Sequence, residues 1–171
     1  MLKGKKIVLG VTGGIAVYKA VDLVSRLRKQ GCEVRVVMTE HAQQFVTPLT
    51  FKEISGNAVA TSMWNSNQEF NVEHIALANW ADAFLVAPAT ANILAKMTYG
   101  IADDLLSTTL LAAQAPIVVC PAMNTGMYLN TATQVNIAKE QSRVTTVTPP
   151  ASGHLASGSS GPGPLQEPPH N

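Results

Sequence analysis

The chain has 171 residues, of which 46% are hydrophobic and only 13% are charged, and its formal net charge is +1. This length fits one domain that can bury a core without disulfide bonds. Because the basic residues are scattered, the sequence lacks the basic surface that is typical of nucleic-acid binding. The charged share is about half of the usual value, which predicts that much of the surface is buried against other copies of the chain.

The cysteines and the first residues bear on where the protein resides. Cys32 and Cys120 lie in unrelated apolar contexts, and we expect both to be reduced residues of a cytoplasmic protein. Lysines followed by an apolar run give the first eleven residues some likeness to a signal peptide. However, Gly13, Gly14 and Lys19 interrupt the run and no small-residue cleavage site follows it, so a buried strand is the better interpretation. No apolar stretch is long enough to cross a bilayer, so no membrane partner is expected.

The first forty residues predict a strand, a helix and a second strand. The strand over 6–11 leads into the pair Gly13-Gly14, and apolar residues at helical spacing then predict a helix that ends near Gly31. The run over 33–38 is apolar on both faces, as in strands buried within a parallel sheet. These elements form a βαβ unit with a right-handed crossover.

The same alternation continues along the chain. We predict strands over 83–87, 117–120 and 144–147, a helix from 91 to about 113, and a helix from about 131 to 140. The fold class is therefore α/β, with a single doubly wound parallel sheet of the Rossmann or flavodoxin-like type in three layers, α/β/α. The polar segment 55–72 is interpreted as a surface excursion.

The loop after the first predicted strand has the composition of a phosphate site. In Val11-Thr12-Gly13-Gly14-Ile15, the glycines allow close approach of the backbone, and the following helix offers free N–H groups. The turn is not GxGxxG, and Thr39 ends the second strand where NAD binding requires an acidic residue, so NAD is disfavoured. The Thr39 hydroxyl suits a phosphate or ribityl group, or equally a helix N-cap. A tight turn without a ligand stays open.

Polar side chains also follow the third and fourth predicted strands, at the same edge of the sheet. Pro88 is expected to break the third strand, and Thr90 and Asn92 then supply a hydroxyl and an amide. Asn124 supplies an amide after the fourth strand, although a turn is another common use of asparagine. Three such loops at one edge favour a ligand site over three unrelated turns.

One histidine and a group of charged residues each have a simple structural interpretation beside a functional one. His74 precedes an apolar helix that carries Trp80; a histidine here is more often structural, but its side chain also suits a base acting on a thiol or carboxylic acid. Lys96, Asp103 and Asp104 are interpreted as solvated helix charges. No Cys/His metal spacing and no Ser-His-Asp order with a nucleophile elbow occurs, so no metal site or hydrolytic triad is expected.

Together, these motifs resemble the family of homo-oligomeric flavin-containing cysteine decarboxylases, which includes the phosphopantothenoylcysteine decarboxylases. Each motif alone is weak, but their ordered set is specific, and the resemblance covers about residues 3–168. The matching segments are the glycine turn, the histidine before Trp80-Ala81-Asp82, Pro88-Ala89-Thr90-Ala91-Asn92, Gly100-Ile101-Ala102-Asp103-Asp104-Leu105 and Pro121-Ala122-Met123-Asn124 with Met127.

The resemblance implies an FMN-dependent, cytoplasmic enzyme of coenzyme A biosynthesis that decarboxylates 4'-phosphopantothenoylcysteine towards 4'-phosphopantetheine. It implies a homotrimer, or a dodecamer built of trimers, with FMN between subunits. In its mechanism the flavin takes a hydride from the cysteine Cβ, the thioaldehyde loses carbon dioxide, and the ene-thiol is then reduced. Residues 1–148 would form the flavin-binding decarboxylase domain. The Pro/Gly/Ser-rich residues 149–171, by composition a flexible terminus, would form a substrate-clamp flap and tail.

Site roles also follow from the resemblance. His74 matches the catalytic base, and Asn124 matches the asparagine that grips the substrate carboxylate. The positions that match the surroundings of FMN are Gly13, Gly14, Ile15, Thr39, Thr90, Ala91 and Ala122.

The flap departs from the family at two positions. Ser157 stands where the family has a cysteine that donates the last proton, and Pro164 stands where it has a basic residue. Because a hydroxyl is a far weaker acid than a thiol, we expect decarboxylation to persist and reduction of the ene-thiol to be slow or absent.

Two alternatives stay open at this point. Relatives that oxidatively decarboxylate the C-terminal cysteine of a precursor peptide stop at the ene-thiol and do not need the clamp cysteine, which Ser157 favours. A non-catalytic flavin-binding regulatory subunit is the other, but such proteins usually carry long acidic tails, which the sequence does not contain.

Overall fold

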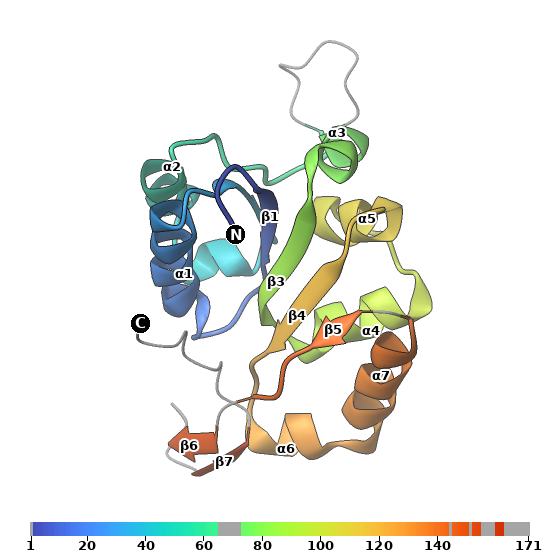
Figure 1. Ribbon diagram of the computed structural model, residues 1–171. Coiled ribbons are helices and arrows are strands. Elements are labelled where there is room, and N and C mark those ends of the chain that lie inside the picture. Colours follow the sequence, from blue (N-terminus) through green and yellow to red (C-terminus); the bar gives the residue numbers. More distant parts are fainter. Residues whose placement is uncertain (1, 65–72, 144, 151, 155–159, 163–171) are drawn as a thin grey trace.

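The computed structural model describes residues 2–64, 73–143, 145–150, 152–154 and 160–162, and Figure 1 shows a parallel sheet between two layers of helices. The sheet has the strand order β2-β1-β3-β4-β5, and every pair in it is parallel. This is the flavodoxin-like order, in which the chain reverses its direction of winding between β1 and β3. The strands are β1 Lys6–Val11, β2 Glu33–Met38, β3 Ala83–Ala89, β4 Ile117–Pro121 and β5 Thr146–Val147.

Apolar side chains on both faces of the sheet bury it between the helices. Along β1, Ile7, Leu9 and Val11 pack on the side of α1 and α2, whereas Val8 packs on the side of α3, α4, α5 and α7. Both sets are almost fully buried, because successive side chains of a strand point to opposite faces. The helices are α1 Val17–Lys29, α2 Pro48–Ser55, α3 Glu73–Trp80, α4 Ala91–Tyr99, α5 Leu105–Ala112, α6 Thr125–Leu129 and α7 Thr131–Ser142, with a 3₁₀ turn η1 at Ala42–Gln44.

The predicted α/β class is confirmed, and so are the predicted strands, except that the strand predicted over 144–147 is only β5 at Thr146–Val147. The single helix predicted over 91–113 is wrong. It is two helices, α4 and α5, separated by a loop. Gly100 ends α4 in the left-handed conformation, with φ +68°. Asp104 begins α5, because its carboxylate accepts a hydrogen bond from the Ser107 N–H at 2.8 Å and Ser107 bonds back to the Asp104 N–H.

The expectation that Pro88 breaks the third strand is also wrong. β3 continues through Pro88 to Ala89, with a cis Ala87–Pro88 peptide bond and a shift of register between Val86 and Ala89. Proline has no N–H to donate to a neighbouring strand, and it lies where the regular pairing with β4 is interrupted. The Pro88 carbonyl accepts a hydrogen bond from the Thr12 N–H at 3.3 Å.

The predicted surface excursion over 55–72 and the tail after residue 148 both contain ordered segments. The polar excursion 55–72 is partly ordered onto the sheet, since Ala60 forms a parallel bridge with Val37 at the β2 edge; residues 65–72 lie outside the described residues. In the tail, β6 Ser152–His154 pairs antiparallel with β7 Ser160–Pro162, and β7 lies against α6 (Figure 1). None of the helices that are described is long and apolar enough to cross a membrane.

Candidate functional site

A cavity of about 680 Å³ opens at the carboxyl edge of the sheet, where β1 and β3 end. Thr12 and Gly13 line it after β1, Thr39 after β2, and Thr90 and Asn92 after β3. The location is the switch point of the strand order, where open α/β sheets bind their ligands. The volume falls within the range of about 300–1,000 Å³ that is typical of small-molecule sites.

The glycine turn presents unpaired backbone donors beside this cavity. The N–H groups of residues 13–16 form no hydrogen bond with any other described residue, and α1 begins immediately afterwards at Val17. The first turn of α1 carries no acidic side chain. Free N–H groups at the positive end of a helix favour an anion, so this turn can hold a phosphate group.

Gly13 is required at this turn by its packing. A Cβ atom at position 13 would lie 2.5 Å from the Cβ of His41 and 2.9 Å from its carbonyl carbon, whereas a Cβ at Gly14 would meet no described residue within 4 Å other than its chain neighbours. The absence of a side chain at position 13 therefore lets the segment after β2 lie directly against the turn.

We expect Gly13→Ala to displace the turn and to destabilise the chain by about 1–3 kcal/mol, because backbone and a short Cβ must move to admit the methyl group. Gly14→Ala is the matched control and should unfold at the wild-type temperature. Thermal unfolding of the ligand-free proteins measures both effects, and equal midpoints for the two variants would contradict the packing argument.

Thr12 fastens the ends of two strands together, a role that the sequence analysis missed. Its buried hydroxyl donates to the Pro88 carbonyl and accepts from the Thr90 N–H at 3.0 Å. The glycine turn and the loop after β3 are thereby held side by side at the cavity. A threonine before a glycine pair is a common pattern, and nothing in it indicates a contact with Pro88 and Thr90, which are more than 70 residues away along the chain.

Thr39 and Thr90 act as caps and also line the cavity. The Thr39 hydroxyl accepts from the Ala42 N–H at 3.2 Å, and the Thr90 hydroxyl accepts from the Ile93 N–H at 3.2 Å. A hydroxyl that accepts one bond can still donate another. The cap interpretation of Thr39 and its interpretation as a ligand group are therefore compatible.

Lys96 lies at the cavity wall, so its interpretation as a solvated charge is wrong. Its side chain is 18% exposed, and its ammonium pairs with the Asp103 carboxylate at 2.7 Å and with that of Asp104 at 4.0 Å. The hydrogen bond from Lys96 lowers the pKa of the Asp103 carboxyl. Sequence spacing did not reveal this pairing, because it depends on the turn of the chain at Gly100.

Asn124 is the N-cap of α6, and one hydrogen bond orients its exposed side chain. Its Oδ1 accepts a hydrogen bond from the Gly126 N–H at 2.8 Å, while its amide NH₂ donates to no other described residue and the side chain is exposed. Met127, one turn further along α6, lines the cavity. The free donor of Asn124 therefore lies on an element that borders the cavity.

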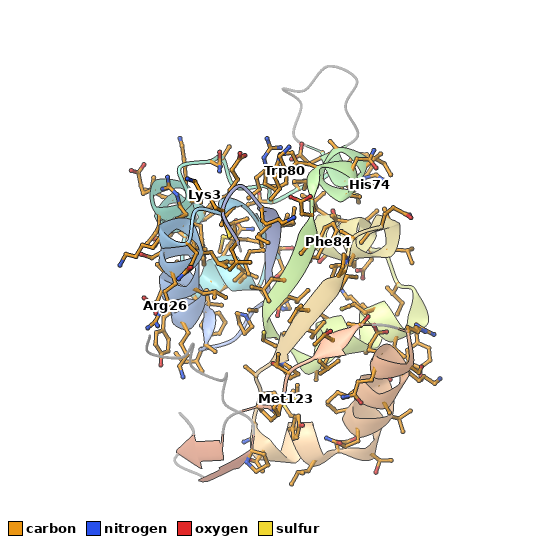
Figure 2. All side chains as sticks on the ribbon, in the orientation of Figure 1. Lys3, Arg26, His74, Trp80, Phe84 and Met123 are labelled. Carbon is orange, nitrogen blue, oxygen red and sulfur yellow. The ribbon has the colours of Figure 1, made fainter. Side chains whose placement is uncertain are left out.

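Several other candidate residues, including His74 and Asn124, are not among the residues that line the cavity. His74, at the start of α3, and the Met123–Asn124 loop lie at opposite ends of the molecule (Figure 2). Ser157 lies outside the described residues. The remaining candidates that do not line the cavity are Gly14, Ile15, Ala91 and Ala122.

In the part of the chain that the structure describes, no group of three or more His, Cys, Asp and Glu side chains is placed to hold a metal ion. The strand order and the cavity with its free N–H groups define a flavodoxin-like α/β protein with a site for a phosphorylated ligand.

Comparison with known proteins gives the family. The family model described as Flavoprotein matches residues 1–170, so the chain belongs to the Flavoprotein family. Among similar curated proteins is the coenzyme A biosynthesis bifunctional protein CoaBC of Vibrio vulnificus (strain YJ016), 50% identical over 167 residues. That alignment covers 98% of this chain and 42% of the relative, so the chain spans less than half the length of this relative.

Two solved structures resemble the chain over nearly their whole length. One is the FMN-dependent cysteine decarboxylase SpaF, with a TM-score of 0.84 and 31% identity over 95% of this chain and 91% of that chain. The other is a cysteine-to-serine variant of PPC decarboxylase complexed with pantothenoylaminoethenethiol, with a TM-score of 0.85 and 30% identity over 96% and 92%. The flavodoxin-like fold predicted from the sequence is confirmed.

Proposed function

We propose that the cavity at the β1/β3 switch point binds FMN. The observation that carries this proposal is the set of free N–H groups at residues 13–16, which adjoin a cavity of about 680 Å³ and suit a phosphate monoester. The hydroxyl groups of Thr39 and Thr90 line the same cavity and retain a hydrogen to donate. FMN dependence of the similar structure SpaF supports the choice of ligand. When bound, FMN supplies hydride acceptance, which the side chains of this protein cannot.

We further propose the reaction, which is decarboxylation of 4'-phosphopantothenoylcysteine towards 4'-phosphopantetheine in coenzyme A biosynthesis. The 50% identity with CoaBC over 98% of this chain supports that substrate over a precursor peptide. The structural likeness to PPC decarboxylase supports it as well, and neither finding favours a non-catalytic regulatory subunit. Residues 1–148 would form the decarboxylase domain, and 149–171 the clamp and tail. The cytoplasm, where coenzyme A precursors are made, is the proposed location.

Asn124 would bind the carboxylate of the substrate. Its Oδ1 is committed to the Gly126 N–H, so the side chain offers only an NH₂ donor to a ligand. A donor suits a carboxylate, which is an acceptor only. The remaining family positions, namely Gly14, Ile15, Ala91 and Ala122, are proposed as FMN neighbours that come close on binding or on assembly.

His74 would act as the base from a neighbouring subunit. Within one chain α3 leads into the amino end of β3, whereas α6 follows the carboxyl end of β4, so His74 and the Asn124 loop lie at opposite ends of the molecule (Figure 2). A homotrimer, or a dodecamer of trimers, would bring His74 of one copy to the cavity of the next. The low charge content supports burial between copies, as do large exposed apolar side chains such as Tyr99, Ile101 and Leu111.

The primary test is a direct assay. The purified chain should show flavin absorption bands, and with 4'-phosphopantothenoylcysteine it should release carbon dioxide and leave a product two hydrogens short of 4'-phosphopantetheine, detected by mass spectrometry. A peptide that ends in cysteine should not react. A colourless protein without turnover after addition of FMN would overturn the proposed function.

Mixing of variants tests whether the site is shared. His74→Ala and Asn124→Asp should each be inactive alone. If they are unfolded, mixed in equal amounts and refolded, about a quarter of the sites should combine an intact His74 with an intact Asn124 and regain turnover. No recovery, in mixtures shown by mass spectrometry to contain hybrid assemblies, would mean that both residues act within one subunit.

A further inference from the structure

We infer that Gly126 is a positioning residue that fixes the direction of the Asn124 amide, and thereby sets the affinity of the site for the carboxylate of its substrate. This inference rests on the proposed function and deepens it. Gly126 is the second residue of α6. It is not among the residues that line the cavity, and Asn124 is the one candidate catalytic side chain among the described residues that a Cβ at position 126 would meet.

Gly126 contacts the Asn124 side chain through its N–H group, and its missing Cβ would also lie close to that side chain. The Gly126 N–H donates to the Asn124 Oδ1 at 2.8 Å. A Cβ atom at position 126 would lie 3.1 Å from the same Oδ1 and, apart from the adjacent residues and the backbone of α6, would meet no other atom of the described residues within 4 Å. The Asn124 side chain is exposed, so it would yield by turning its amide. A methyl group at position 126 therefore acts on one atom, the oxygen that orients the amide.

The backbone of α6 does not itself require glycine at position 126, which is not among the glycines with positive φ. The helix is anchored at its other end, where the Asn130 N–H donates to the Gly126 carbonyl at 3.0 Å and the Asn130 side chain caps α7. Alanine is also a better helix former than glycine. On stability grounds alone, alanine would be preferred at position 126. We therefore attribute the glycine to its contact with the Asn124 amide.

The direction of the Asn124 amide matters because its oxygen accepts hydrogen bonds whereas its NH₂ group donates them. With Oδ1 held by the backbone, the NH₂ group points outwards as the donor. If the amide turns, the donor leaves the direction in which a carboxylate is bound. Loss of part of a hydrogen bond to a charged group lowers affinity by about five- to tenfold.

The test is Gly126→Ala in the full chain with FMN bound, with Leu129→Ala, an exposed apolar position on the same helix, as the control. The probe is the serine analogue of 4'-phosphopantothenoylcysteine, which keeps the carboxylate but has no thiol. We expect Gly126→Ala to raise its Kd about five- to tenfold, to raise KM for the substrate with kcat nearly unchanged, and to leave the unfolding temperature equal or higher. The affinity for 4'-phosphopantetheine, which has no carboxylate, should not change.

A double variant shows whether Gly126 acts through Asn124. In an Asn124→Ala background, Gly126→Ala should not weaken analogue binding further. An unchanged Kd in the single variant would overturn the inference, and so would the same loss with and without Asn124. Failure of the proposed function would look different, because the wild-type chain would then neither bind the analogue nor turn over the substrate.

Discussion

Asn124→Asp should leave the chain folded and lower kcat/KM for 4'-phosphopantothenoylcysteine by at least about a hundredfold. An aspartate is nearly isosteric and can still accept the hydrogen bond that the Gly126 N–H gives to Oδ1. It removes the NH₂ donor, however, and places a negative oxygen where the substrate carboxylate is proposed to bind. Loss of a bond to a charged group costs about 1.5–3 kcal/mol, and like-charge contact adds to this.

Asn124→Ala separates the two roles of the side chain. It removes the donor and also the cap of α6, so it should lose activity and, in addition, about 1 kcal/mol of stability, a fall of about 2–4 °C in unfolding temperature. Asn124→Asp should show the first effect without the second. Wild-type turnover by Asn124→Asp would remove Asn124 from the carboxylate site, whatever the stability of the variant.

Ser157→Cys should change the product of the reaction. The wild-type chain should stop at the ene-thiol, with the two electrons from the substrate left on the flavin until dissolved oxygen reoxidises it. The cysteine variant should return these electrons to the product and yield saturated 4'-phosphopantetheine. The reason is acidity, since a thiol titrates near 8.5 and a serine hydroxyl is a much weaker acid, so only the former readily donates the last proton. The presence of pantothenoylaminoethenethiol in a cysteine-to-serine variant of PPC decarboxylase supports this expectation.

Mass spectrometry distinguishes the two products, which differ by two hydrogens. Ser157→Ala is the matched control, and it should give the same product as the wild type, because the hydroxyl is not expected to contribute a proton. If the wild-type chain forms the saturated thiol at full rate and Ser157→Ala does so too, another group donates the proton, and the clamp argument fails.

The sequence determined the sheet and the loops at its carboxyl edge. Strands buried on both faces are continuous apolar runs, as at 6–11 and 33–38, and such runs are recognisable without any knowledge of their neighbours. Because parallel strands place their carboxyl ends at one edge, the glycine turn, Thr39 and Thr90 could be expected around one cavity, and the structure places them there. The roles of the site residues in binding and catalysis stay predictions.

The tertiary structure alone decided how these parts are joined and separated. The passage of β3 through Pro88 and the hydrogen bonds of Thr12 to the loop after β3 depend on contacts with distant residues, which local periodicity does not record. The same is true of the pairing of Lys96 at the cavity wall. It also separated His74 from the Asn124 loop, since α3 leads into the amino end of β3 whereas α6 follows the carboxyl end of β4 (Figure 1). Residue spacing along a chain specifies which side chains are available, but the order and direction of the strands specify which of them can meet.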